Sequence, residues 1–219
     1  MLNNMKQLIN AKMIRVISLS FIICHLSFSL CACSESEDEE TSEFGSNWQQ
    51  RNETFFASLE DSLSRNANVW IKLKTFTKDE DVAGANTDYI YAHVLEASND
   101  MYSPMYTDSV RVSYRGRLIP SASYAEGYVF DQTYIGTFNW KTSAVINSLC
   151  SGFINGFTTA LLHMHRGDRW RIYIPYQLGY GKDGSGSSVP GYSTLVFDIA
   201  LVDFCPTTES LPKWSARER

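Results

Sequence analysis

The stretch that decides the fold reads IYIPYQLGYG and covers residues 172–181. It begins as a strand, because Trp170, Ile172 and Ile174 alternate with more polar neighbours, the period-two pattern of a sheet with one buried face. After Pro175 the stretch holds aromatic residues and glycines but no charged group. It therefore predicts a site made of rings and backbone groups, and neither a metal cradle nor the loop of a nucleophile.

The segments on either side of this stretch predict the rest of the fold. Alternating apolar residues predict strands at 69–76, 89–96, 110–116, 129–131 and 195–201. A short helix is expected over about residues 155–163, because Phe157, Leu161 and Met164 share one helical face. The sequence thus predicts an α+β fold, in which an antiparallel sheet carries one short helix across a face.

A longer helix is expected ahead of the first strand. Between Trp48 and Leu63 the apolar residues fall on one helical face, and Ser46 or Asn47 can cap its start. We expect residues 47–104 to form an N-terminal helix and strand extension whose apolar stripe packs on the domain. The alternative is a dimerisation arm.

The composition is that of a globular protein. Hydrophobic residues make up 44% of the 219 residues and charged residues 20%. The net charge is -5, and no run of Lys or Arg marks a nucleic-acid surface. No nucleic-acid partner is therefore expected.

Residues 1–32 resemble a lipoprotein signal peptide. Three cationic residues precede an apolar run that is too short for a comfortable membrane span. The following LCAC resembles a lipobox, which implies cleavage before Cys33, lipidation of its thiol and a membrane anchor. An ordinary secretory signal is the alternative. The acidic linker, residues 33–46, is either a plain spacer or a tag for the outer face of the outer membrane.

The remaining motifs indicate neither metal nor cofactor chemistry. Residues 179–184 match G-x-G-x-x-G, but the Ser- and Gly-rich run behind them cannot begin the helix that a dinucleotide site needs. His163 and His165 point apart, and no His or Cys cluster has zinc spacing. Cys150 and Cys205 are the two cysteines after Cys33, and in an oxidising compartment they can form one disulfide. The sequence does not decide whether they pair. We expect no cofactor and no metal.

Several motifs occur together in the order and spacing of one family. They are VRVSYRG at 110–116, FD at 130–131, FINGF at 153–157, ALLHMHRGD at 160–168, the opening stretch, and VPGYSTLVF at 189–197. Residues 105–205 thereby resemble the FKBP-type, macrolide-binding peptidyl-prolyl isomerases. The resemblance implies a half-barrel of antiparallel sheet wrapped around one short helix. It also implies that the domain binds proline-containing polypeptides and macrolide inhibitors, and it leaves residues 206–219 as a C-terminal tail.

The resemblance implies roles for nine residues in the isomerase site. Phe157 would be the floor beneath the proline ring. The backbone N–H of Ile154 and the hydroxyl of Tyr180 would each hold a substrate carbonyl, and Asp131 would shape the polar rim near Tyr114. The residues expected to line the substrate pocket are Tyr114, Phe130, Phe153, Phe157, Val189 and Phe197.

Rotation about an X-Pro bond needs no nucleophile. Its barrier of roughly 18–20 kcal/mol comes from amide resonance, so an apolar pocket with a few fixed donors can favour the twisted state. Two departures from the family are visible: Phe157 stands where Trp is common, and the long segment 134–150 leaves Phe138 and Trp140 without a role. We expect an isomerase for exported proteins at the cell envelope. A non-catalytic chaperone or binding module is the alternative, and no nucleophile supports a hydrolase.

Overall fold

The computed structural model describes residues 43–45 and 47–212. The predicted signal peptide, Cys33, most of the acidic linker, Ser46 and the end of the tail lie outside this part of the chain. Among the described residues no helix combines the length and the apolar character of a membrane span.

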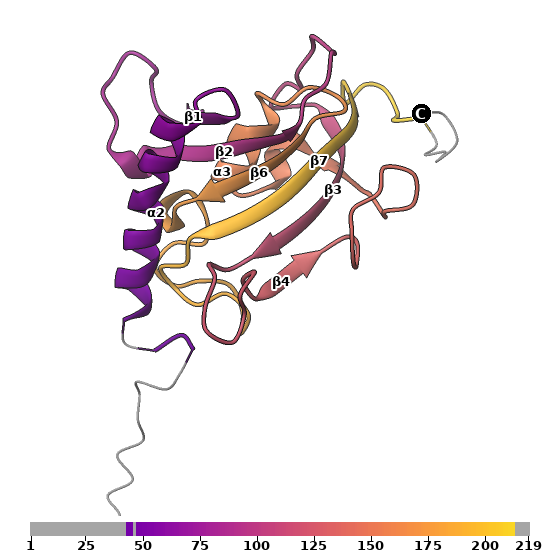
Figure 1. The fold of residues 1–219 in the computed structure, drawn as a ribbon. Helices are drawn as coiled ribbons and strands as arrows, with labels where there is room; N and C mark the ends of the chain where they lie inside the picture. Colours follow the sequence, from indigo (N-terminus) through magenta and orange to yellow (C-terminus); the bar gives the residue numbers. More distant parts are fainter. Residues whose placement is uncertain (1–42, 46, 213–219) are drawn as a thin grey trace, which may run out of the picture. The chain divides into compact units, whose positions relative to one another are not determined.

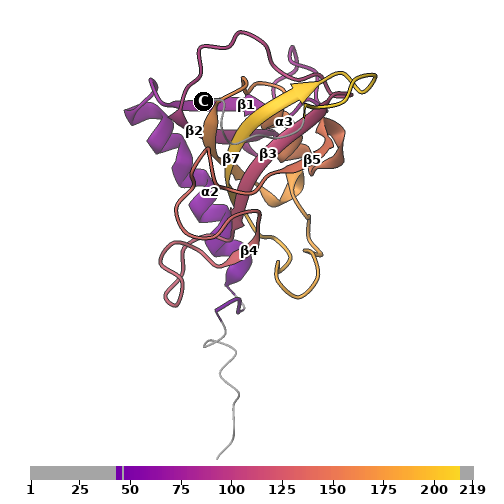
Figure 2. The same cartoon turned by 90° about the vertical axis from the view of Figure 1, so that its right-hand side faces the viewer.

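Within the described residues, seven strands form one sheet, and all of its pairings are antiparallel (Figure 1). The spatial order is β1-β2-β6-β7-β3-β4 (Figure 1), and β5 also pairs with β3 (Figure 2). The strands are β1 (Trp70–Lys74), β2 (Tyr89–Glu96), β3 (Ser109–Arg117), β4 (Val129–Gln132), β5 (Ile146–Leu149), β6 (Arg169–Ile174) and β7 (Leu195–Cys205).

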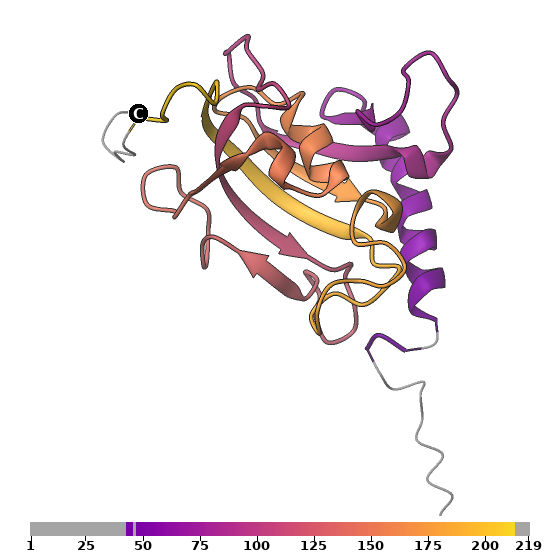
Figure 3. The same cartoon turned by 180° about the vertical axis from the view of Figure 1, so that it is seen from behind.

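The short helix α3 (Asn155–Leu161) covers one face of this sheet, which we call the inner face. It lies behind the sheet in Figure 1 and in front of it in Figure 3. Strand side chains alternate between the two faces, so every second residue of β6 and β7 points toward α3. Ile172, Ile174 and Ile199 are fully buried in the resulting core. The predicted α+β fold is confirmed.

The N-terminal helix α2 (Trp48–Arg65) packs its apolar stripe on the opposite face, which we call the outer face. Phe56 and Leu59 of α2 are buried against Tyr91 of β2, and the ring centroids of Phe56 and Tyr91 lie 5.2 Å apart. Tyr91 pairs with Tyr173 across β2 and β6, which continues the same apolar surface. The stripe is therefore buried within the chain, as the periodicity predicts.

The extension and the isomerase-like segment share one sheet. β2, which belongs to the expected extension, pairs with β6 over Tyr91–Glu96. The structure also contains β5, a strand that the alternation of residues 146–149 did not reveal. In the described chain, Cys150 and Cys205 are both free and buried. Cys150 follows β5 and Cys205 ends β7, and these two strands flank β3 on opposite sides. The backbones of the two strands are therefore roughly 10 Å apart. A disulfide requires Cα atoms within about 7 Å, so this arrangement does not allow one between the two cysteines.

Candidate functional site

Five aromatic rings meet on the inner face, and we call them the aromatic cluster: Tyr114, Phe130, Phe153, Phe157 and Phe197. Phe157 lies at its centre. Its ring is stacked on Phe153 with centroids 4.5 Å apart and meets Tyr114 and Phe197 edge-on at 5.7 and 5.2 Å. Phe157 and Phe197 are buried, whereas the other three rings are partly exposed. The cluster thus has a buried base and a solvent-facing side.

Two glycines allow the rings to approach. A Cβ atom at Gly116 of β3 would lie 2.6 Å from Phe197 and 2.7 Å from Phe130, closer than carbon atoms pack. A Cβ atom at Gly156 would lie 2.3 Å from Ile174, so glycine lets α3 sit directly on β6. The hydrophobic pattern alone gives no reason for glycine at these positions, but the close packing requires it.

A polar group marks the rim of the cluster. The Tyr114 hydroxyl donates to Oδ2 of Asp131 at 2.7 Å. Burial, together with this hydrogen bond and the charge of Asp131, holds the pKa of Tyr114 well above its ordinary value. Burial and the same carboxylate also raise the pKa of Tyr180. Both phenols therefore remain protonated donors at neutral pH, and both are within electrostatic reach of Asp131.

Two donors near the cluster have no acceptor among the described residues. The Ile154 backbone N–H makes no hydrogen bond there, whereas its carbonyl accepts from the N–H groups of Phe157 and Thr158 at 2.9 and 3.0 Å. Ile154 is the N-cap of α3, which leaves its own N–H outside the helical ladder. The Tyr180 hydroxyl likewise has no partner in the described chain, and its ring packs against the core. Both groups are available to an incoming carbonyl.

The loop after Tyr180 contains Val189, which is buried and belongs to the same hydrophobic core as Phe157 and Phe197. Gly184 has a positive φ, and a Cβ atom there would meet the carbonyl oxygen of Val189 at 2.1 Å. The Tyr192 N–H donates to the carbonyl of Gly181 at 3.0 Å, which ties the end of the loop to its start. No helix follows residues 179–184, so the match to a dinucleotide motif is accidental.

α2 is hydrogen-bonded to the end of this loop. The indole N–H of Trp48 donates to Ser193 Oγ at 3.0 Å, and Ser193 Oγ donates to the Pro190 carbonyl at 2.6 Å. Asn52, fully buried, accepts from the Thr194 N–H at 2.8 Å through its side-chain oxygen. These contacts join residues more than 140 positions apart. The sequence offered only an apolar stripe here, so this polar contact was missed.

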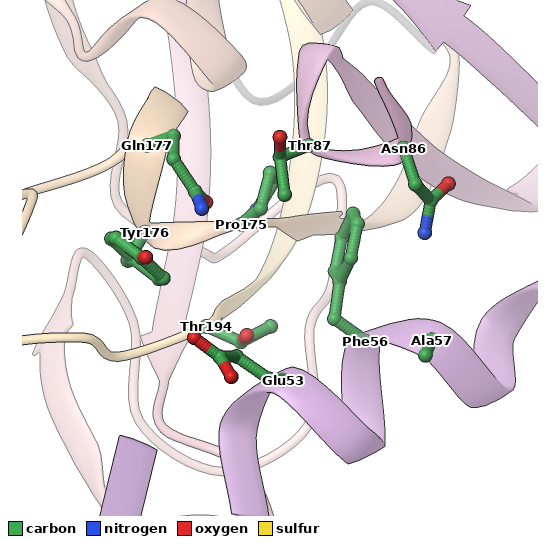
Figure 4. A pocket seen from close by; sticks show the side chains of 9 residues that line it. All are labelled: Glu53, Phe56, Ala57, Asn86, Thr87, Pro175, Tyr176, Gln177 and Thr194. Carbon is green, nitrogen blue, oxygen red and sulfur yellow. The ribbon is translucent and has the colours of Figure 1, made fainter. Parts of the chain in front are cut away.

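α2 also faces the segment that leads into Tyr180. Figure 4 shows Phe56 and Glu53 of α2 opposite Pro175 and Tyr176, where the short helix η4 (Tyr176–Leu178) begins. A hollow of about 180 Å³ lies between them. α2 thus lies next to the segment that precedes Tyr180, at residues 175–177, and to the segment that follows it, at residues 193–194.

The structure brings together the residues predicted for the site, and it places two others elsewhere. Phe138 and Trp140 pack on the outer face: Arg169 lies 5.0 Å from the Phe138 ring, and Trp140 donates to Glu96 at 2.8 Å. They do not join the aromatic cluster. Among the described residues, no group of His, Cys, Asp or Glu could hold a metal ion.

Comparison with known proteins gives one family. Residues 102–202 match the model of the FKBP-type peptidyl-prolyl cis-trans isomerases. The chain is 37% identical over 100 residues to a macrophage infectivity potentiator of Trypanosoma cruzi, covering 46% of this chain and 45% of that protein. It is equally identical, over 46% of this chain and 43% of the relative, to an FKBP-type 22 kDa peptidyl-prolyl cis-trans isomerase of Escherichia coli.

A solved structure agrees with the fold. It is a peptidyl-prolyl cis-trans isomerase from Pseudomonas syringae, with a TM-score of 0.50, 25% identity, and coverage of 71% of this chain and 92% of that chain. The match spans less than half the length of each of these two curated relatives. The likeness therefore concerns the domain that carries the aromatic cluster.

Proposed function

We propose that this chain, whose residues 102–202 form an FKBP-type domain, catalyses cis-trans isomerisation of X-Pro bonds in polypeptides. The observation that carries the proposal is the aromatic cluster, together with two donors at its edge that have no acceptor among the described residues. In this reaction no covalent bond breaks, so shape and hydrogen bonding can supply the whole effect.

The aromatic cluster would receive the proline ring. Phe157, 2% exposed, forms the floor, and Tyr114, Phe130 and Phe197 stand around it. Apolar contacts favour the twisted bond, because twisting removes amide resonance and makes the carbonyl less dipolar than the planar, better hydrated form. Phe157 is smaller than Trp, so the platform beneath the ring is smaller too.

The donors would fix the carbonyls on either side of proline. The Ile154 N–H and the Tyr180 hydroxyl can each give one hydrogen bond to the substrate. Asp131 holds the Tyr114 hydroxyl at 2.7 Å, which orients that ring and keeps the rim polar. Donors that are already in place lower the barrier without reorganising during the reaction.

A tetrapeptide isomerisation assay with the purified chain tests this proposal. Uncatalysed exchange takes tens of seconds, so acceleration is easy to observe. Tyr180→Phe should lower kcat/KM by roughly 2- to 10-fold, the equivalent of one hydrogen bond of about 0.5–1.5 kcal/mol. Asp131→Ala should lower it as well, because the Tyr114 hydroxyl loses its acceptor.

No acceleration by the native chain would refute the function, and unchanged rates in both variants would refute the residue roles. A macrolide inhibitor should compete with the peptide.

We further propose that the protein acts at the cell envelope on exported polypeptides, anchored through lipid on Cys33. The support is the LCAC motif and the acidic run that follows it. Labelled palmitate should enter the native chain and not Cys33→Ser. Protease treatment of intact cells then distinguishes a surface-facing domain, which is cleaved, from a periplasmic one, which is protected.

A non-catalytic chaperone role has one observation in its favour. Met101, Tyr102 and Met105 are 84, 74 and 70% exposed in the segment between β2 and β3. Adaptable methionine and tyrosine side chains suit a surface that holds unfolded chains. Suppression of client aggregation without any isomerase activity would select this function.

A further inference from the structure

A second hollow lies on the outer face, on the side of β7 opposite the aromatic cluster. Phe197 of β7 points inward, so Val196 and Asp198 point outward. The hollow measures about 150 Å³, the size of a cavity that can take a benzene ring. It is lined by Phe55, Arg117, Pro120, Glu126, Arg171, Tyr173 and Val196.

Two guanidinium groups share a single carboxylate at this hollow. Arg171 donates to Asp198 through two nitrogens, at 2.6 and 3.0 Å, and Arg117 donates to Asp198 Oδ2 at 2.7 Å. The Arg117 and Asp198 side chains are only 8 and 6% exposed. Asp198 thus accepts from both guanidinium groups, and the second negative charge at the hollow is that of Glu126, which is more exposed.

Arg117 has a donor that the chain does not satisfy. Its Nε–H is buried and has no acceptor among the described residues. A buried donor without a partner costs about 1–3 kcal/mol, and native proteins contain few of them. An acceptor that enters the hollow could satisfy this group once the side chains that shield it from solvent move aside.

The rest of the hollow is apolar and partly aromatic. Phe55 of α2 and Tyr173 of β6 have ring centroids 6.1 Å apart, and Val196 forms a buried floor. A planar carboxylate matches the fork of a guanidinium group, and a flat ring matches the aromatic wall. We propose that this hollow binds a carboxylate carried next to an aromatic ring. This site is independent of the isomerase proposal.

Glu126 modulates the charge of the hollow. It lines the rim from an exposed loop and makes no ion pair with Arg117 or Arg171 in the described chain. Hydrogen bonding to Asp198 is the main reason that the pKa of Arg171 is raised, and the charge of Glu126 adds to it. The charges of Arg117 and Arg171 are balanced by those of Asp198 and Glu126, so the hollow has no net charge. A carboxylate ligand would add a negative charge, and it therefore binds only when Glu126 turns away toward solvent.

Nuclear magnetic resonance titration of the full chain tests the proposal, with the arginine Nε–H signals as the readout. The probes are benzoate, neutral benzamide, N-acetylphenylalanine and its amide. Benzoate and N-acetylphenylalanine should shift the Arg117 and Arg171 signals, with dissociation constants on the order of 1 mM for ligands of this size. The two amides should not. Tighter binding of N-acetylphenylalanine than of benzoate would indicate peptide C-termini, and the reverse a free aromatic acid.

Three variants define the site. Arg117→Gln should weaken benzoate binding at least tenfold, and Phe55→Ala should weaken it severalfold without touching the ion cluster. Glu126→Gln should strengthen it by about threefold, because one repulsive charge is gone. The latter two changes lie on partly or fully exposed positions, so they remain informative if Arg117→Gln does not fold. Equal shifts with benzoate and benzamide, no shift at tens of millimolar, or binding unaffected by Glu126→Gln and Phe55→Ala would overturn the proposal.

Discussion

Gly116→Ala is the most direct test of whether the aromatic cluster is the surface that binds the substrate proline. The new methyl group would lie 2.6 Å from Cε1 of Phe197 and 2.7 Å from Cζ of Phe130. Carbon atoms pack at about 3.5–4.0 Å, so these rings must together move by roughly 1 Å. Phe197 is held at 5.2 Å from Phe157 and is buried, whereas Phe130 is partly exposed. Phe130 should therefore swing outward.

The size of the effect follows from this movement. Overpacking typically costs about 1–3 kcal/mol of the free energy of unfolding, and the freedom of Phe130 favours the lower end. A displacement of about 1 Å at a catalytic surface can lower the rate by roughly 100-fold. We expect Gly116→Ala to lose about 1–2 kcal/mol of stability and to lower kcat/KM of tetrapeptide isomerisation by about 10- to 100-fold.

Gly84→Ala is the matched control. Its methyl group would lie 3.0 Å from the ring of Tyr89, so it also presses on an aromatic side chain, but far from the aromatic cluster. It should leave kcat/KM within about twofold of native. Urea unfolding gives the stability of both variants. A folded Gly116→Ala protein with native kcat/KM would refute the assignment of Phe130 and Phe197 to the site.

Three other perturbations have defined outcomes. Asn52→Ala removes the acceptor of the buried Thr194 N–H, so urea unfolding should show a loss of roughly 1–3 kcal/mol, and an unchanged midpoint would contradict this. Burial raises the pKa of Asp198, but hydrogen bonding and charge from Arg171 outweigh it and hold the pKa below its usual range. Native Asp198 therefore stabilises the protein above about pH 4, the value in unfolded chains, and the difference from Asp198→Asn should shrink as pH falls through the depressed value; a constant difference would refute this. The Tyr114 phenol should show no ultraviolet ionisation signal near pH 10, because its pKa is raised, and the native spectrum minus that of Tyr114→Phe should show none there.

Local sequence pattern determined much of this protein. The alternation around Ile172 predicted β6, the helical spacing around Phe157 predicted α3, and the boundaries of β2 were read correctly as residues 89–96. These features depend on neighbours in the chain, where a period of two or of 3.6 residues reports which side is buried. The family motifs then named the rings that the structure brings into one cluster.

Tertiary structure alone decided the rest, because contacts between distant residues depend on strand order and register. Trp48 and Asn52 reach Ser193 and Thr194 only because α2 crosses the sheet beside the loop. Arg117, Asp198 and Arg171 stand on three different strands, and no spacing along the chain connects them. Phe138, an aromatic residue like the others, packs on the outer face. Periodicity indicates that a side chain is buried, but the fold decides which distant residue it meets.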